Sequence, residues 1–407
     1  MNSSPVALDS LDLFGESFVR DPYPTLDLLR ESAPVHHHPD TGLWLVSRYR
    51  DVREVLLDPV AFLPDNAQQA VTPLTVAALR PLVRSGFSLP PALADNGGPT
   101  HHGLRRLVTR FFNAQRVAEA VPLIERTALE LLSPVRERLD GRGHCDLVAD
   151  FARVLPCRVM IELLGVEGAD PLTLARWSDA SLELFWGRPS PERQVQLAVL
   201  AGEFHTWLTE RCTGSAAPGS LMAALRDEAP DTATAVAVCY FVLIAGQATT
   251  GQLIATVLRR ALDDGAAWER AAAEEGFAEA WSEEVLRREP PVTTWRRRAA
   301  RDVSIGGVQV PAGAPLLLML MGTGSDPEVF DEPARLCPHR PNARLHLSFG
   351  AGRHRCPGAL LARTEAAIAL RTAARSLPGL MASAGAEPPL LGLLSFRAPT
   401  EVTAHRR

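Results

Sequence analysis

The chain has 407 residues, of which 46% are hydrophobic and 22% are charged, and its formal net charge is −5. This composition is typical of a globular protein with a large core, and it excludes collagenous, fibrous and disordered classes. All 42 basic residues are arginine, and the acidic balance argues against a nucleic-acid partner, because such a partner requires a basic stripe.

The amino-terminal segment 1–14 has no basic run followed by an apolar stretch and a cleavage site, so no signal peptide is predicted. No run of about 18 consecutive apolar residues is present, which argues against a membrane-spanning helix. The cysteines lack paired spacing and are expected to be free thiols in a reducing cytoplasm: Cys145, Cys157, Cys212, Cys239, Cys337 and Cys356. We therefore predict a cytoplasmic protein.

The first half of the chain is predicted to be mostly helical. A helix is expected at 22–31, followed by two short strands at 34–38 and 43–47 around a Pro-Asp-Thr-Gly turn. From about His101 the apolar spacing predicts helix after helix, at 104–112, 115–140, 146–164, 171–186, 191–212, 231–263 and 277–288. No linker or internal repeat divides this region.

A small β region follows the helices. Strands are expected at 293–298, 303–305, 308–310 and 315–319, then a helix at about 356–376 and a strand pair around 391–403. We predict one mainly α domain with a small β region (α+β) over 1–407. Its β-containing portion covers about 34–48, 292–319 and 391–403, and its helical portion covers about 101–288 and 356–376.

Two segments carry candidate chemistry. The helix at 231–263 has an apolar middle, yet Gly246-Gln247-Ala248-Thr249-Thr250 interrupts it. In the segment from Phe349 to Gly358, glycines allow a tight turn, and Cys356 lies near a helix start that favours a thiolate. Such a thiolate is a potential axial haem ligand. The alternatives are a threonine that bonds to the preceding helical turn and a cysteine that only packs.

The Cys356 segment resembles the haem-thiolate loop of the cytochrome P-450 family. Other motifs follow in the family's order. His101-x-x-x-Arg105 is similar to the family's propionate-binding helix, and the segment 245–250 is similar to its oxygen-groove motif. Glu284-x-x-Arg287 is similar to the Glu-x-x-Arg residue pair on the helix before the β region. Pro22-Tyr23-Pro24 and the segment 326–330 also fit bacterial members. The resemblance covers nearly the whole chain and implies the P-450 fold, with the long helix over haem b and the cysteine loop below it.

The resemblance implies specific cofactor contacts. Cys356 is the implied axial ligand of the iron. Cofactor binding is also implied for His101, Arg105, Arg297, His354, Phe349, Gly350 and Gly358. Arg297 is preferred over its neighbours by its spacing to Asp302 and by strand alternation, and an arginine fork suits a carboxylate. The pair Glu284 and Arg287 is expected to lock the segment beneath the haem, with Arg335 or Arg340 as a further partner.

On the oxygen side, the implied catalytic positions are Gly246, Ala248, Thr249 and Thr250. Most family members carry an acid where this chain has Ala248. Protons are therefore expected to arrive through water, Gln247, Thr250 or the substrate, with Thr249 donating to the distal oxygen. Gly246 is expected to leave room for dioxygen.

The implied activity is monooxygenation of a natural product in bacterial secondary metabolism, such as C–H hydroxylation, with electrons from a ferredoxin or flavodoxin and its reductase. The alternative suggested by Ala248 is oxidative aryl coupling of an aromatic substrate, such as a tryptophan-containing cyclic dipeptide. A non-catalytic haem sensor is a second alternative. A zinc site among Cys337, His339, His346, His354 and Cys356 is disfavoured, because paired ligand spacing is missing.

The expected substrate lining is mostly apolar with few amides, which suits a bulky aromatic or hydrophobic ligand. It comprises Gln68, Gln69, Leu89, Phe185, Trp186, Leu243, Ile244, Val292, Thr293, Thr294 and Leu394. A basic patch is expected to steer an acidic redox partner and comprises Arg106, Arg110, Arg116, Arg353 and Arg355. We expect a monomer with no nucleic-acid or membrane partner.

Overall fold

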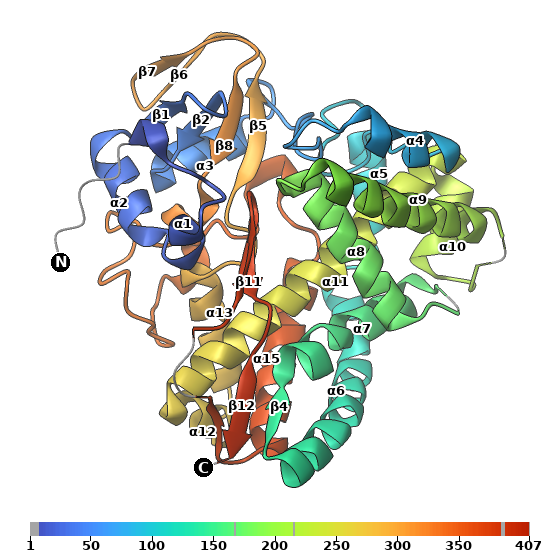
Figure 1. Cartoon of the computed structure of the whole chain (residues 1–407), viewed down its shortest axis with the longest axis vertical. Coiled ribbons are helices and arrows are strands. Elements are labelled where there is room, and N and C mark those ends of the chain that lie inside the picture. The colour runs from blue at the N-terminus through green and yellow to red at the C-terminus, as the bar shows by residue number, and fades with distance from the viewer. Residues whose placement is uncertain (1–7, 167, 215, 384–386, 407) are drawn as a thin grey trace.

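The computed structural model describes residues 8–166, 168–214, 216–383 and 387–406, and it is mainly helical with small sheets (Figure 1), as predicted. The helices are α1 Glu16–Arg20, α2 Tyr23–Ser32, α3 Tyr49–Leu57, α4 Val76–Arg84, α5 His101–Thr109, α6 Ala114–Arg142, α7 Val154–Leu164, α8 Pro171–Trp186, α9 Pro191–Thr213, α10 Leu221–Glu228, α11 Thr232–Asp263, α12 Gly265–Ala273, α13 Phe277–Arg288, α14 Leu320–Thr323 and α15 Ala359–Ser376.

The strands are short. They are β1 Val35–His38, β2 Leu43–Val46, β3 Phe62–Leu63, β4 His144–Asp146, β5 Trp295–Ala299, β6 Val303–Ile305, β7 Val308–Val310, β8 Pro315–Leu318, β9 Leu380–Ala382, β10 Leu390–Leu393, β11 Phe396–Pro399 and β12 Thr403–Arg406. The largest sheet has the order β1-β2-β8-β5-β3, with β2 and β8 parallel. Gly306 and Gly307 both have positive φ and join β6 to β7, which confirms the predicted hairpin turn.

Three predicted helices begin at least three residues from the predicted start. The helix expected at 104–112 is α5, His101–Thr109. The helix expected at 146–164 is instead strand β4, the π-helical turn η2 (Val148–Ala152) and α7. The Asp146 carboxylate accepts from the amides of Val148 and Val402, which ties this segment to the carboxy-terminal strand. The last helix begins at Ala359, so Cys356 lies in the loop before it.

Helix α11 crosses the middle of the molecule and packs against α7, α8, α9 and α15 (Figure 1). By length and composition it is the one helix among the described residues that could cross a membrane, but 61% of its most apolar window is buried inside the protein. Its apolar middle is therefore accounted for by the protein core, as predicted.

Candidate active site

The loop before α15 holds Cys356. The Cys356 amide donates to the Phe349 carbonyl at 2.8 Å, which closes the loop. Gly350 and Gly352 both have positive φ, and a Cβ on Gly352 would lie 2.8 Å from the Leu56 carbonyl at the end of α3. The glycines therefore serve backbone geometry and close packing. Cys356 is exposed, whereas the other cysteines are buried or half-buried.

Burial and neighbouring groups act in opposite directions on the pKa of the Cys356 thiol. Desolvation by the surrounding walls raises the pKa of its thiol, although the Gly358 amide and the Arg105 guanidinium act in the opposite direction. Helix α15 begins three residues after Cys356, at Ala359. A metal ion supplies the missing positive charge in such sites, because a coordinating thiol is deprotonated.

A buried cluster of cationic and imidazole side chains lies beside this loop. The His101 and His354 rings are 4.4 Å apart, and Arg353 Nε lies 3.1 Å from His101 Nδ1. Burial, together with nearby arginines, lowers the pKa of His101 to about 4 and that of His354 to about 3. Burial alone lowers the pKa of Arg297 to about 10. Both imidazoles are therefore neutral at pH 7, whereas the buried Arg297 guanidinium keeps its positive charge.

Polar atoms of this cluster lack partners among the described residues. These atoms are Nε2 of His101 and both ring nitrogens of His354, while Arg297, only 3% exposed, donates to the Arg296 carbonyl. Buried groups of this kind require an anion, and two haem propionates meet that requirement. The residues present therefore fit haem b, which Cys356 would bind through its thiolate and whose propionates Arg297, His101 and His354 would hold.

Strand β5 separates the three consecutive arginines. The Arg296 guanidinium donates to the carbonyls of Ala67 and Gln69. Arg298 is exposed and paired with Asp65. Alternation places Arg297 on the opposite face of β5 from these two residues, which agrees with the choice of Arg297.

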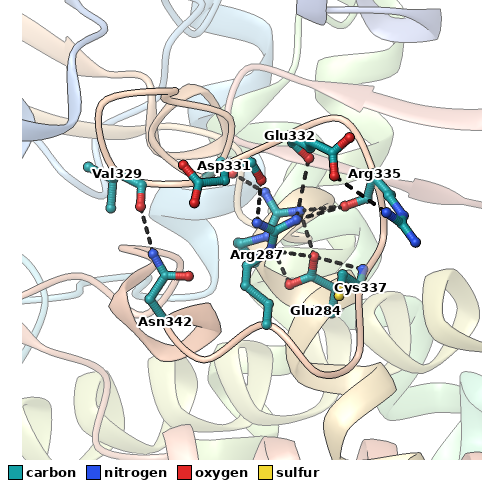
Figure 2. Close-up of polar contacts among 10 residues, drawn as sticks. Glu284, Arg287, Val329, Asp331, Glu332, Arg335, Cys337 and Asn342 are labelled. Carbon is teal, nitrogen blue, oxygen red and sulfur yellow. Dashed lines mark hydrogen bonds and ion pairs between the residues drawn. The ribbon is translucent and has the colours of Figure 1, made fainter.

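The Glu284–Arg287 pair is fully buried and supports the segment beneath the site (Figure 2). Arg287 donates to both carboxylate oxygens of Glu284, at 2.8 and 2.9 Å. Arg340 Nε is 2.9 Å from the same carboxylate, and the Cys337 amide donates to it at 3.0 Å. Of the two expected partners, Arg340 supplies the side chain, whereas Arg335 supplies its backbone carbonyl to Arg287.

A second buried acid was missed by the sequence analysis. Glu283 binds Arg363 of α15 at 2.6 Å and His346 at 3.0 Å. Burial alone would raise the pKa of Glu283, but these two partners outweigh it and lower the pKa to about 2. Arg363 also lies 4.5 Å from the centre of the Phe349 ring, so Glu283 anchors the cysteine loop to α13. In the sequence, the only indication of this second acid is that Glu283 is adjacent to Glu284 of the Glu-x-x-Arg motif.

On α11, Thr249 and Ala248 are half-buried. The Thr249 hydroxyl donates to the Ala245 carbonyl at 2.6 Å, as in the back-bonding alternative. A Cβ on Gly246 would lie 2.5 Å from Met160 Cε, so close contact with α7 explains this glycine. Room for dioxygen at Gly246 stays a prediction.

The Gln247 side chain is not free for proton transfer in this arrangement. The Gln247 amide nitrogen donates to the Leu174 carbonyl at 3.1 Å and to the Ser178 hydroxyl, and its oxygen accepts from the Cys157 thiol. Gln247 therefore ties α11 to α7 and α8. Thr250 is also buried.

The predicted substrate lining is only partly brought together. Val292 forms a bridge with Phe396, and Thr294 donates to the Leu394 carbonyl at 2.8 Å, so these two segments meet. However, Thr293, Thr294 and Leu394 line a small cavity that faces Leu13 and Phe18 of the amino-terminal region. Thr294 and Leu394 are buried there, and the assignment of these three residues to the substrate side stays a prediction.

The other candidate lining residues lie in several places. Leu243 and Ile244 are buried in the main core, and Leu89 and Phe185 pack against it half-buried. Trp186 is buried with an unpartnered indole nitrogen, and Gln68 has an unpartnered amide nitrogen, among the described residues. Gln69 contributes its carbonyl to Arg296.

A cavity of about 700 Å³ was not predicted. It lies between η2, α8, α11 and the β10–β11 hairpin, and its walls include Ala248, Gln252, Asp179, Arg188 and Leu391. The position that lacks the family's acid therefore borders a large, partly polar cavity.

The positive charge of the expected basic patch is reduced, because two of its arginines form ion pairs. Arg110 pairs with Glu228 at 2.5 Å, and Arg116 lies 3.7 Å from Glu119. Arg353 donates to His101 and to the Gly98 carbonyl. Arg106 and Arg355 remain as exposed arginines near the cysteine loop. Among the zinc candidates, His346 is bound to Glu283, which separates it from the others.

The fold and this site define a haem-thiolate oxidoreductase, and the comparisons agree. The Cytochrome P450 family model matches residues 276–378. The chain is 32% identical to Cytochrome P450 107B1 of Saccharopolyspora erythraea, over 91% of each chain. It is 33% identical to Cytochrome P450 monooxygenase PikC of Streptomyces venezuelae, over 93% of this chain and 89% of the relative.

A solved structure of similar fold is cytochrome P450 CREJ in complex with (4-ethylphenyl) dihydrogen phosphate. Its TM-score is 0.89 at 28% identity, with 96% of this chain and 98% of that chain covered. The protein belongs to the bacterial cytochrome P450 family, and it is an enzyme of the monooxygenase class that uses haem.

Proposed function

We propose that the protein hydroxylates an unactivated C–H bond of a bulky, mostly apolar natural product, using dioxygen and electrons from a ferredoxin-type partner. The observation that carries the proposal is the combination of Cys356 with the buried cluster of Arg297, His101 and His354, which fits haem b. The relatives are named as a monooxygenase, an epoxidase of cyclomarin C and a vitamin D(3) 25-hydroxylase. We also propose that it acts in the cytoplasm as one monomeric domain.

Within this proposal the residues have distinct tasks. The haem supplies a thiolate-ligated iron whose electron-rich axial ligand favours O–O cleavage. The Arg297 guanidinium would neutralise its carboxylates, and the neutral imidazoles of His101 and His354 would orient them through hydrogen bonds. The Thr249 hydroxyl must leave the Ala245 carbonyl before it can donate on the oxygen side, a local rotation about one side-chain bond.

The experiment for the reaction type is turnover under ¹⁸O₂ with a ferredoxin and its reductase, scored by mass spectrometry on a panel of polycyclic and aromatic natural products. Incorporation of one labelled oxygen supports hydroxylation. Coupled product without label supports the second candidate, oxidative aryl coupling, which is favoured by Ala248 at the acid position. Ala248→Glu, with Ala248→Ser as the matched control, then tests whether the missing acid determines this choice.

For the redox partner, we propose the face around Arg106 and Arg355, which are exposed near the cysteine loop. An acidic partner is steered by such charge, so the association rate falls as ionic strength rises. The variant Arg106→Ala with Arg355→Ala is expected to slow ferredoxin-dependent reduction. Arg110→Ala is the matched control, because Arg110 is already paired with Glu228. Equal rates for all three proteins would reject this face.

A further inference from the structure

Two buried cysteine thiols contact each other in the helical part of the molecule. Cys212 Sγ lies 3.9 Å from Cys239 Sγ, and each residue is only 2% exposed. Cys212 belongs to the last turn of α9, and Cys239 lies near the start of α11. Because these two helices pack against each other, two residues that are 27 positions apart in the chain bring their sulfur atoms together.

Other buried cysteines have different surroundings. The Cys157 thiol donates to the Gln247 side-chain oxygen, and Cys145 lies on strand β4. A buried cysteine commonly acts as a small apolar side chain, and that task requires no second thiol beside it. The contact between Cys212 and Cys239 therefore makes possible a reaction between two thiols, which packing alone does not require.

The two thiols differ in how readily they lose a proton. The hydrogen bond with Cys239 stabilises the Cys212 thiolate and lowers the pKa of Cys212, against the opposing effect of burial. The hydrogen bond with Cys212 and burial both raise the pKa of Cys239. Because the thiolate is the reactive form of cysteine, Cys212 is the nucleophile of the pair and Cys239 is its resolving partner.

Cys212 is also the thiol closer to a helix end. Helix α9 ends at Thr213, which is exposed. Helix ends open more readily than helix middles, because their last carbonyls lack partners within the helix. Cys239 lies inside α11 between the buried residues Val238 and Tyr240. A small oxidant therefore reaches Cys212 first, through local opening of the last turn of α9.

We propose that Cys212 and Cys239 are a reversible redox modification site, in which hydrogen peroxide converts the two thiols to an internal disulfide. The Cys212 thiolate attacks one peroxide oxygen and the O–O bond breaks. Cys212 becomes a sulfenic acid, and the released hydroxide takes up the Cys212 proton to form water. The Cys239 sulfur then attacks the sulfenic sulfur, and its proton leaves with the hydroxyl as a second water. In total, two thiols lose two electrons and one peroxide is reduced to two waters. A dithiol reductant restores both thiols.

The disulfide fastens the end of α9 to α11. The sulfur atoms approach from 3.9 Å to about 2 Å, and rotation of both side chains with a small shift of the last turn of α9 accommodates this approach. The bond closes the segment 212–239, which includes α10, into a loop. Because such a loop restricts the unfolded chain, the midpoint of thermal unfolding is expected to rise by about 4 °C on oxidation.

The test is a graded dose of hydrogen peroxide on the folded holoprotein, followed by peptide mass spectrometry. The remaining thiols are alkylated in urea, and the protein is digested with trypsin without reduction. Cleavage after Arg211, Arg226 and Arg259 places the two cysteines on neighbouring peptides. We expect these peptides to be found joined, lighter than their sum by two hydrogen atoms, and to be separated again by dithiothreitol.

Two variants separate this bond from general oxidation. In Cys239→Ser, Cys212 has no resolving partner, so we expect a sulfenic acid that dimedone traps and no rise in the thermal midpoint. Cys145→Ser is the matched control, because Cys145 is a buried cysteine on a different element, β4. This variant is expected to form the joined peptides and to gain about 4 °C, as the unaltered protein does.

Three results overturn the proposal. The first is that both thiols stay reduced at every dose. The second is oxidation of Cys212 to a sulfinic or sulfonic acid in the unaltered protein without joined peptides. The third is that joined peptides form only when peroxide is added to urea-unfolded protein, because the folded structure would then keep the two sulfur atoms from reacting.

Discussion

Replacing Glu284 by alanine tests the buried network beneath the site. Glu284 and Arg287 are both 0% exposed, and the Arg340 guanidinium shares the same carboxylate. Removing this acid leaves two cationic side chains with no neutralising partner, one of them fully buried. Breaking a buried pair in this way costs about 3–5 kcal/mol of unfolding free energy.

The assay is urea unfolding of the holoprotein, followed by far-ultraviolet circular dichroism. With an m-value of about 3 kcal/mol per molar urea, the midpoint is expected to fall by roughly 1 M or more. The matched control is Glu332→Ala, because Glu332 and Arg335 form an exposed pair with side chains 76% and 71% accessible. Such a pair contributes about 0–1 kcal/mol. Equal midpoints for the two variants would refute the reasoning.

Three further predictions follow from the same geometry. The pKa of Glu283 is lowered from 4.5 to about 2, so its ionised carboxylate stabilises the fold above pH 4.5, and this stability is lost as pH falls towards 2. In urea titrations, Glu283→Gln is expected to lower the free energy of unfolding by about 3 kcal/mol at pH 7 and by little at pH 2. Burial raises the pKa of Glu365 to about 8, so its carboxyl destabilises the fold increasingly as pH rises from 4.5 to 8. Glu365→Leu is expected to raise the free energy of unfolding at pH 8 and not at pH 4. An equal increase at both pH values would contradict burial of the charged carboxylate as the cause. Arg297→Leu is expected to speed haem transfer to apomyoglobin about tenfold or more, whereas Arg298→Leu, at an exposed pair, leaves the rate unchanged.

Sequence patterns predicted the elements whose signals are local. Helices α8 and α13 have the predicted bounds because a proline at the first position or a glycine before the helix marks their starts. The segment 146–164 was predicted wrongly because Asp146 is held by a strand more than 250 residues later. No local pattern contains such a contact.

The site shows the same division. The Glu284–Arg287 pair was predictable because a spacing of three residues places both side chains on one helix face. The choice of Arg340 over Arg335 and the contacts of Gln247 with α7 and α8 depend on packing between distant elements. The roles of Cys356, the propionate-side residues and the lining residues stay predictions.

The most direct measurement of the central claim is the absorption spectrum of the dithionite-reduced protein under carbon monoxide. We expect the red-shifted Soret band that gives the family its name, its loss in Cys356→Ala and its retention in Cys337→Ala. A band that persists in Cys356→Ala, or a protein that binds no haem, would contradict Cys356 as the axial ligand and the roles of the residues around it.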